Sequence, residues 1–265
     1  MSSEEFRLTV LGTRGSMPIC GENYSIYGGN TSCYWVQAGE ENIFLDAGTG
    51  LLKAPVEFPK PPVILLSHLH LDHILGLGVY PRLLHSELET YLLIPANEME
   101  CSLNILNSFY TPPFWPLNLE EYGSHLHIDQ PLFPLQIGDV RVSCMSGNHP
   151  GSCLSYRLEW HGKSIVYMTD YEMEPLSFMK LSHFAADTDL LLFDAQYSPQ
   201  EYERKKGFGH STALSALKMM KSCRAKKILL IHHDPQSTDD ILSAREKMLE
   251  IVHAHYAREG DTILL

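Results

Sequence analysis

The sequence predicts an α/β protein, and two features of the chain support this prediction. Short apolar runs typical of buried strands alternate with segments in which apolar residues recur at helical spacing. His and Asp residues follow several of the apolar runs, as expected where strand ends meet at one edge of a sheet. The 265 residues are enough to bury a sizeable core. No linker or shift in composition divides the chain, so we expect one domain over residues 1–265.

The composition, with 44% apolar and 20% charged residues, is typical of a soluble globular protein. No apolar stretch reaches the roughly 18 residues of a membrane helix. The opening residues lack the basic and apolar parts of a signal segment, and the six cysteines form no Cys-x-x-Cys pair, so we expect a cytoplasmic protein with free thiols. A net charge of −12 disfavours broad adhesion to nucleic acid. The negative net charge is still compatible with a small anionic substrate, because a bound metal ion makes the local charge positive.

Taken in order, alternating and apolar runs predict a series of short strands. They cover residues 6–11, 33–36, 42–46, 62–66, 91–94, 140–145, 154–158, 165–168, 190–193, 227–231 and 262–264. Apolar residues at helical spacing predict helices over 74–85, 97–107, 213–220 and 237–256, the last beginning with a Ser237–Asp240 capping pair. Prolines and aromatic residues exclude regular structure at 110–116, which is either a packed surface loop or a contact for substrate access or a dimer.

Two polar residues near the start of the chain have open roles. Arg14 lies in a glycine-containing turn and is either a substrate contact or a solvated loop residue. Asp46 follows a strand and precedes glycines, so it forms a turn, orients a ligand histidine, or does both.

The most informative stretch is Ser67–His73, which directly follows the apolar run at 62–66. If the backbone stays extended, His68 and His70 point to one side, because side chains alternate along a strand. A turn after them then brings Asp72 and His73 towards a neighbouring point. Imidazole and carboxylate groups are ligands for zinc, manganese or iron, so the stretch predicts a metal site.

Further candidate ligands follow other apolar runs, at His149, Asp170, Asp194 and His232. Each of them alone is weak support for a metal site. Together with the dense motif at 68–73 they indicate one site built where several strands end.

These residues resemble the metallo-β-lactamase superfamily. The resemblance covers Leu-Asp-Ala-Gly at 45–48, His-x-His-x-Asp-His at 68–73, and then His149, Asp170 and His232 in the family's order. It implies a four-layer αββα sandwich, the metallo-β-lactamase fold, with a site for two divalent metal ions along one edge of the two sheets. It further implies that His68, His70 and His149 bind one ion, that Asp72, His73 and His232 bind the other, and that Asp170 bridges them.

The implied chemistry is metal-assisted hydrolysis, in which Asp72 orients or deprotonates the attacking water. Zinc is the expected metal, with manganese or iron as alternatives. Family members with a redox di-iron site typically have Glu at the second histidine of the motif, which is His70 here, so a redox function is disfavoured. His233, next to the last ligand, is expected to have a supporting or structural role.

The second half of the chain narrows the expected substrate. Asp194 in Phe-Asp-Ala-Gln-Tyr, followed by His210 in Gly-His-Ser-Thr, resembles the phosphodiesterase branch that contains ribonuclease Z. The resemblance implies that Asp194 holds His210 and that His210 donates a proton to the leaving alkoxide, which is worth about 10²–10⁴-fold. The alternative for this segment is the start of a helix capped by Ser211 or Thr212.

The branch also contains tRNA-processing enzymes, but they carry a long basic arm before the bridging aspartate. Between His149 and Asp170 this chain has room for only two strands and a turn. We therefore expect a dinuclear phosphodiesterase acting on a small phosphodiester, with a cyclic nucleotide as the best candidate and a homodimer as the family's usual assembly. The alternatives are an acyl hydrolase such as a lactonase, thioesterase or β-lactamase, a ribonuclease Z-like nuclease, and a non-catalytic nucleotide-binding module.

Overall fold

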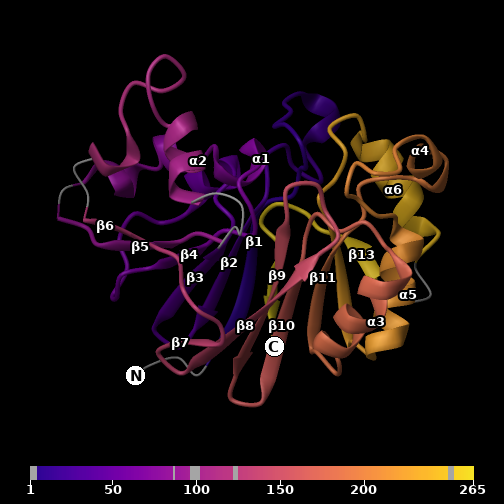
Figure 1. The fold of residues 1–265 in the computed structure, drawn as a ribbon. Helices are drawn as coiled ribbons and strands as arrows, with labels where there is room; N and C mark the ends of the chain where they lie inside the picture. Colours follow the sequence, from indigo (N-terminus) through magenta and orange to yellow (C-terminus); the bar gives the residue numbers. More distant parts are fainter. Residues whose placement is uncertain (1–4, 86, 96–101, 122–124, 250–253) are drawn as a thin grey trace.

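The computed structural model describes residues 5–85, 87–95, 102–121, 125–249 and 254–265. Two mixed sheets of seven strands each form its centre, with helices outside them. This arrangement confirms the predicted four-layer sandwich (Figure 1).

The first sheet is built mainly from the N-terminal half of the chain. Its strands are antiparallel where β14, β1, β2 and β3 pair, and parallel from β3 through β6. In spatial order they are β14 (Thr262–Leu264), β1 (Phe6–Gly12), β2 (Cys33–Ala38), β3 (Glu41–Leu45), β4 (Val63–Leu65), β5 (Thr90–Leu93) and β6 (Leu126–Asp129).

The second sheet repeats this division into a parallel and an antiparallel part. Strands β10 to β13 pair in parallel, and β7 to β10 pair antiparallel. In spatial order they are β13 (Ala254–Tyr256), β12 (Lys227–Ile231), β11 (Leu190–Asp194), β10 (Lys163–Met168), β9 (Cys153–Trp160), β8 (Val140–Gly147) and β7 (Leu135–Ile137).

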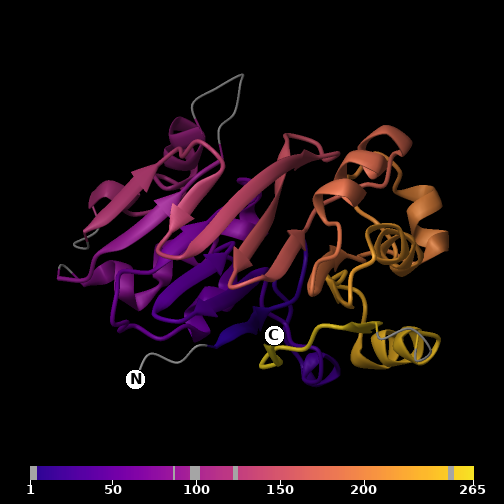
Figure 2. The ribbon, with the colours of Figure 1, turned by 90° about the horizontal axis from the view of Figure 1, so that it is seen from below.

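Three apolar clusters hold the four layers together. One lies between the sheets, one between the second sheet and its helices, and one between the first sheet and the helical turns outside it. The helices are α1 (Leu71–Ile74), α2 (Ser102–Phe109), α3 (Pro175–Phe184), α4 (Pro199–Arg204), α5 (Ala213–Cys223) and α6 (Asp239–Lys247). Shorter 3₁₀ turns are η1 (Glu22–Tyr24), η2 (Thr49–Lys53), η3 (Leu77–Val79), η4 (Pro81–Leu84) and η5 (Leu119–Glu121). Seen from below, α3, α5 and α6 lie together beyond the second sheet, away from the first (Figure 2).

The parallel strands end in backbone kinks that aim polar side chains at one edge of the sandwich. Asp46, Asp170 and His232 follow β3, β10 and β12, and their φ angles are 62°, 45° and 63°. Residues other than glycine seldom adopt this left-handed region, although Asp and His do so more readily than most. The fold thus accepts local backbone strain where candidate ligands meet.

The predicted helix over 74–85 is wrong. Only α1 and two 3₁₀ turns form there, and Pro81 starts the second turn. Gly76 and Gly78 allow close packing that a regular helix would not: a Cβ on Gly76 would lie 2.2 Å from the carbonyl oxygen of Gly48, and one on Gly78 would lie 2.2 Å from the Trp115 ring. Tertiary contacts therefore override the helical spacing.

The other differences are smaller. Thr238, and not Ser237, caps α6, and Tyr256 lies in β13 instead of continuing that helix. The predicted helix at 97–107 corresponds to α2, and its first part lies outside the described residues. Five of the six cysteines are described and all five are free. Among the helices of the described ranges, none has the length and apolar character that crossing a membrane requires.

The loop at 110–116 packs on the turns outside the first sheet. The buried Tyr110 donates its hydroxyl to the carbonyl of Ile74 at 2.6 Å, and its ring meets Trp115 edge-on with centroids 5.4 Å apart. Phe114 between them is 72% exposed. The loop is therefore anchored through Tyr110, and residues 112–114 and 116 are exposed.

Candidate metal centre

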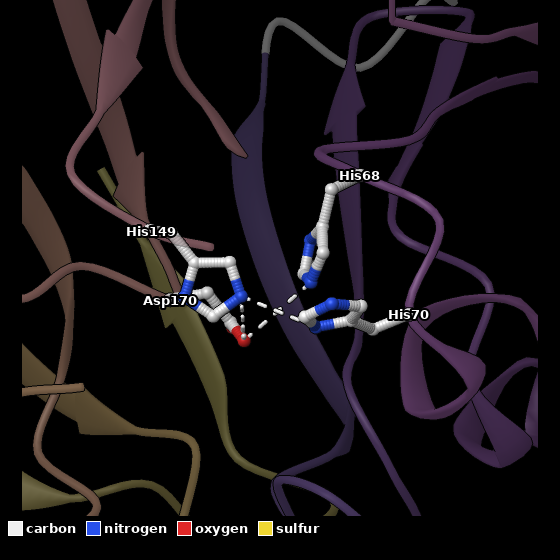
Figure 3. Close-up of side chains that lie close together, drawn as sticks. All are labelled: His68, His70, His149 and Asp170. Atoms are coloured by element: carbon white, nitrogen blue, oxygen red, sulfur yellow. Dashed lines mark hydrogen bonds and ion pairs between the residues drawn. The ribbon is translucent and has the colours of Figure 1, made fainter. Parts of the chain in front are cut away.

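One group of candidate ligands brings three imidazoles to a carboxylate. His68 and His70 follow β4 of the first sheet, and His149 follows β8 of the second. The Nε2 atom of His149 lies 3.1 Å from Nδ1 of His70, and the Nε2 atoms of His149 and His68 lie 3.7 and 3.6 Å from Oδ2 of Asp170. Figure 3 shows the four side chains converging. Their ligand atoms lie within 4.8 Å of one another, close enough to hold a metal ion.

A second group lies beside the first and contacts the same aspartate. Asp72 and His73 belong to α1, and His232 follows β12. The Nε2 atom of His232 is 3.1 Å from Oδ2 of Asp72 and 3.3 Å from Nε2 of His73. Oδ1 of Asp170 is 3.2 Å from His73 and 3.1 Å from His232. Because each Asp170 oxygen faces a different group, the carboxylate lies where a bridging ligand would lie. The structure thus brings all seven predicted ligands together.

Three of the histidines turn Nε2 towards this centre, and the Nδ1 atom of each of them donates a hydrogen bond to the surrounding protein. The acceptors are the Asp46 carboxylate for His73 (2.6 Å), the Gly209 carbonyl for His149 (3.0 Å) and the Gln196 amide oxygen for His232 (3.1 Å). An imidazole that donates through one nitrogen offers a lone pair on the other. The Nε2 atom of His68 is buried and has no hydrogen-bond partner among the described residues. These side chains fit divalent metal ions.

Asp46 is hydrogen-bonded to His73 of the second group and, through Ser67, to His68 of the first group. Its Oδ2 accepts hydrogen bonds from His73, from the hydroxyl of Ser67 (2.8 Å) and from that of Tyr167 (2.6 Å), and its Oδ1 accepts the Ser67 amide at 2.6 Å. The Ser67 hydroxyl oxygen in turn lies 3.0 Å from Nδ1 of His68. Asp46 therefore has both roles that the sequence left open, since it forms the kink after β3 and orients ligand histidines.

An Asp46→Asn variant is expected to weaken metal binding by about 10–100-fold, the usual cost of losing a partner that orients a ligand histidine. Asparagine tolerates the left-handed backbone, but its amide group leaves a buried donor unpaired, which lowers the free energy of unfolding by about 1–3 kcal/mol. Chelator competition and denaturant titration measure the two effects. Asp129→Asn, at the exposed end of β6, is the matched control. Equal metal affinity in the two variants would show that Asp46 has no orienting role.

The two groups differ in protonation before metal binds. Burial lowers the pKa of His68, His70 and His149, so the histidines of the first group are neutral at pH 7. Burial also acts to lower the pKa of His232, but nearby carboxylates, with Asp170 the strongest, raise it to about 9. Carboxylates likewise outweigh burial at His73 and hold its pKa well above the usual range. The second group therefore carries protons that a metal must displace.

We expect metal affinity at the second group to rise with pH through at least about 9, because His232 loses its proton near that value and the pKa of His73 is raised as well. The gain is roughly tenfold per pH unit for each proton displaced. Calorimetry in buffers of different ionisation enthalpy counts the released protons, and chelator competition between pH 6.5 and 9 gives the affinity. Binding that is independent of pH and releases no protons would contradict this assignment.

A buried His–Asp pair lies beside the second group. Nδ1 of His210 is 2.8 Å from Oδ2 of Asp194, the last residue of β11. The His210 ring also stacks on the His232 ring with centroids 4.8 Å apart. The alternative prediction for this segment, a capped helix start, is also correct, because the Thr212 side chain caps α5. Since Asp170, Asp194, His210 and His232 also form a group able to hold a metal, geometry alone allows His210 to donate a proton or to bind an ion.

The loop that carries His210 is fixed by a residue that the sequence did not single out. Oε2 of Glu172 accepts the backbone amides of Gly207 (2.8 Å) and Gly209 (3.0 Å). Gly209 has a φ of 89°, and a Cβ there would lie 2.0 Å from Nδ1 of His149. In the sequence, Gly209 directly before His210 is the local indication that the backbone passes close to another residue here. Glu172 thus ties the loop to the segment of Asp170, and His149 ties it to the first group.

A pocket of about 370 Å³ opens at the centre. Its lining residues are Ser16, Leu69, His70, Leu71, Asp72, Asp170, His210 and His232.

Arg14 is not among the lining residues, and both roles predicted for it are wrong. Its side chain is fully buried, and it donates hydrogen bonds to the carbonyls of Gly28 (2.7 Å), Asp234 (3.1 Å) and Ser237 (2.7 Å). Arg14 therefore anchors its loop to the segment after β12. His233 is likewise structural, because its Nε2 donates to the Ala257 carbonyl at 2.8 Å.

Comparisons with known proteins agree with this architecture. The family model for the beta-lactamase superfamily domain matches residues 41–233. The probable metallo-hydrolase YhfI of Bacillus subtilis is 26% identical over 262 residues, which cover 96% of this chain and 98% of that protein. Its crystal structure matches with a TM-score of 0.72 at 21% identity, covering 99% of this chain and 100% of that one.

Two further matches carry other names. Ribonuclease BN of Proteus mirabilis is 23% identical over 304 residues, covering 89% of this chain and 93% of that protein. The crystal structure of a new diphosphatase from the PhnP family matches with a TM-score of 0.71 at 18% identity, covering 98% of this chain and 97% of that one.

Two packed sheets with His and Asp clusters at their shared edge define a metallo-hydrolase of the β-lactamase fold. The family model spans more than half of the sequence, so the chain belongs to the metallo-β-lactamase superfamily, in its ribonuclease Z-like branch. The resemblance identified in the sequence is thereby confirmed.

Proposed function

We propose that this protein is a phosphodiesterase that uses two divalent metal ions to hydrolyse a small phosphodiester, with a cyclic nucleotide as the leading candidate. The observation that carries the proposal is the His210–Asp194 pair, in which Nδ1 of His210 lies 2.8 Å from Oδ2 of Asp194 and His210 lines the metal-centre pocket. Cleaving a phosphodiester expels an alkoxide, which is a poor leaving group without a proton donor. An acyl hydrolase with the same metal ligands would not need such a pair.

The chain's own residues have distinct roles in this proposal. His68, His70 and His149 would hold one ion, and Asp72, His73 and His232 would hold the other, with Asp170 between them. Ions of this kind polarise the substrate and lower the pKa of water towards neutrality. Zinc is the first candidate, with manganese or iron as alternatives.

Asp72 and His210 would handle the attacking water and the leaving group. Burial acts to raise the pKa of Asp72, but His73 and His232 hold it well below the usual range. Asp72 therefore stays ionised and orients the water more readily than it removes a proton. To act as the acid, His210 carries a hydrogen on both ring nitrogens: it donates Nδ1–H to Asp194 and delivers the Nε2 proton to the departing oxygen.

Three observations favour a small substrate over tRNA. Only the β9–β10 hairpin lies between His149 and Asp170, so this part of the chain has no room for an RNA-gripping arm. None of the described residues that line the pocket is lysine or arginine. Lys205 and Lys206, just before His210, pair with Asp234 (3.1 Å) and Glu203 (2.8 Å).

A hydrolysis screen run beside metal analysis tests the proposal. The panel holds cyclic nucleotides, bis(p-nitrophenyl) phosphate, precursor tRNA, a lactone and a cephalosporin, and we expect the highest kcat/KM with a cyclic nucleotide. Preference for the lactone or the cephalosporin would identify an acyl hydrolase, and preference for precursor tRNA would identify a processing nuclease. Metal-loaded protein that hydrolyses nothing would indicate a nucleotide-binding module.

We also propose that the protein is a homodimer, as the family resemblance implies, and that it acts in the cytoplasm. The exposed tip of the 110–116 loop at Phe114 is a candidate dimer contact. Light scattering of the wild type and of Phe114→Ser measures the assembly, and cell fractionation measures the location.

A further inference from the structure

A line of hydrogen bonds connects a candidate metal ligand to the surface of the pocket. Nδ1 of His232 lies 3.1 Å from Oε1 of Gln196, and Nε2 of Gln196 donates to the hydroxyl of Ser16 at 3.1 Å. His232 and Gln196 are buried, with exposures of 0% and 3%, whereas Ser16 is exposed and lines the pocket. The two bonds thus link the metal centre to a hydroxyl that a substrate can reach.

The direction of these bonds follows from the chemistry of His232. When its Nε2 binds a metal, its hydrogen is on Nδ1, so Nδ1 donates and Oε1 of Gln196 accepts. The amide of Gln196 must then present its NH₂ group to Ser16. Because the Ser16 oxygen accepts that bond, its own hydrogen is available to an acceptor in the pocket.

Ser16 is also held in place by its backbone. Its amide donates to Oδ2 of Asp72 at 2.7 Å, and its φ is 64°. The preceding Gly15 lies against the His232 ring, since a Cβ there would come within 2.3 Å of Nδ1. Arg14, one residue earlier, ties the loop to three backbone carbonyls. A donor fixed in this way needs little reorganisation to meet an anion.

We propose that Ser16 is a substrate contact whose hydroxyl donates a hydrogen bond to a non-bridging phosphoryl oxygen. Gln196 is the positioning residue that directs this hydrogen into the pocket. This proposal rests on the proposed phosphodiesterase function. The described residues that line the pocket include no lysine or arginine, so the Ser16 hydroxyl would be a neutral hydrogen-bond donor to the phosphoryl group. Losing a hydrogen bond to a charged group corresponds to about 10–100-fold in affinity.

Three variants test the proposal, with bis(p-nitrophenyl) phosphate for turnover and inorganic phosphate for binding by calorimetry. Ser16→Ala is expected to lower both kcat/KM and phosphate affinity by about 10–100-fold at unchanged metal content. Gln196→Glu keeps the size of the side chain and its bond to His232, but its carboxylate accepts the Ser16 hydrogen and so turns it away from the pocket. We expect a similar loss in Gln196→Glu, and little further loss in the double variant.

Gln136→Glu, an exposed site on β7 with the same change in charge, is the control and should match the wild type. If the Gln196→Glu substitution acted only through its new charge and not through Ser16, the fold-losses of the two single variants would multiply in the double variant. That result would overturn the positioning role of Gln196. Wild-type turnover by Gln196→Glu would overturn it as well.

Unchanged phosphate affinity in Ser16→Ala, or metal-loaded wild type that does not bind phosphate, would overturn the contact itself. If the wild type hydrolyses no phosphodiester but Ser16→Ala still loses phosphate affinity, the proposed function fails and the Ser16 contact stands.

Discussion

A His210→Ala variant is expected to lose about 10²–10⁴-fold in kcat with a cyclic nucleotide while keeping its metal content. The reason is the fixed geometry of the pair, in which Asp194 accepts Nδ1–H at 2.8 Å and the doubly protonated ring delivers its Nε2 proton to the leaving alkoxide. The loss should be much smaller with bis(p-nitrophenyl) phosphate, because nitrophenolate departs without a proton. Steady-state kinetics with both substrates, beside metal analysis, measures the difference.

The comparison of leaving groups separates a proton donor from other roles of His210. Equal losses with both substrates would indicate that the ring only shapes the pocket. Loss of a metal ion together with activity would make His210 a ligand, in the group that it forms with Asp170, Asp194 and His232. His183→Ala, at an exposed position on α3, controls for the removal of an imidazole. Unchanged turnover of the cyclic nucleotide would end the proton-donor hypothesis.

The sequence predicted the location of the centre because the ligands follow a simple rule. Parallel strands of a sheet end at the same edge, so polar residues after the apolar runs at 165–168 and 227–231, which belong to one sheet, had to lie near one another. The sandwich then brings the edges of both sheets together, and this step came from the family resemblance. The kinks at Asp170 and His232, which aim the side chains, have no signature in a single sequence.

The supporting residues could not be predicted in the same way, because their partners are distant in the chain. Gln196 and Ser16 are 180 positions apart, and Arg14 reaches a carbonyl 220 positions away. Arginine in a glycine-containing turn suggested a surface role, yet its Nε and Nη1 atoms donate to three buried carbonyls around it. The predicted helix over 74–85 failed for a related reason, since Gly76 and Gly78 meet backbone and ring atoms of other segments.

Replacing the shared carboxylate should have the largest effect on the metal centre. An Asp170→Asn variant is expected to bind metal at least about 100-fold more weakly than the wild type. Losing a residue that only hydrogen-bonds to a ligand costs up to about 100-fold, and losing a ligand itself should cost more. The hydrolytic activity of the variant should fall with the bound metal. Oδ1 of Asp170 lies within 3.2 Å of Nε2 of His73 and of His232, and Oδ2 faces His68 and His149, so one substitution removes an anionic oxygen from both groups.

Asparagine is the informative replacement, because it tolerates the φ of 45° at this position better than alanine does. Asp189→Asn, a partly buried aspartate just before β11 and outside the centre, is the control. Metal titration by mass spectrometry shows whether Asp170→Asn holds no ion, one or two. Two ions at wild-type affinity would show that Asp170 is not a bridge. One retained ion would show that the two groups load separately, and the first group, whose histidines are neutral before metal binds, should be the one that keeps it.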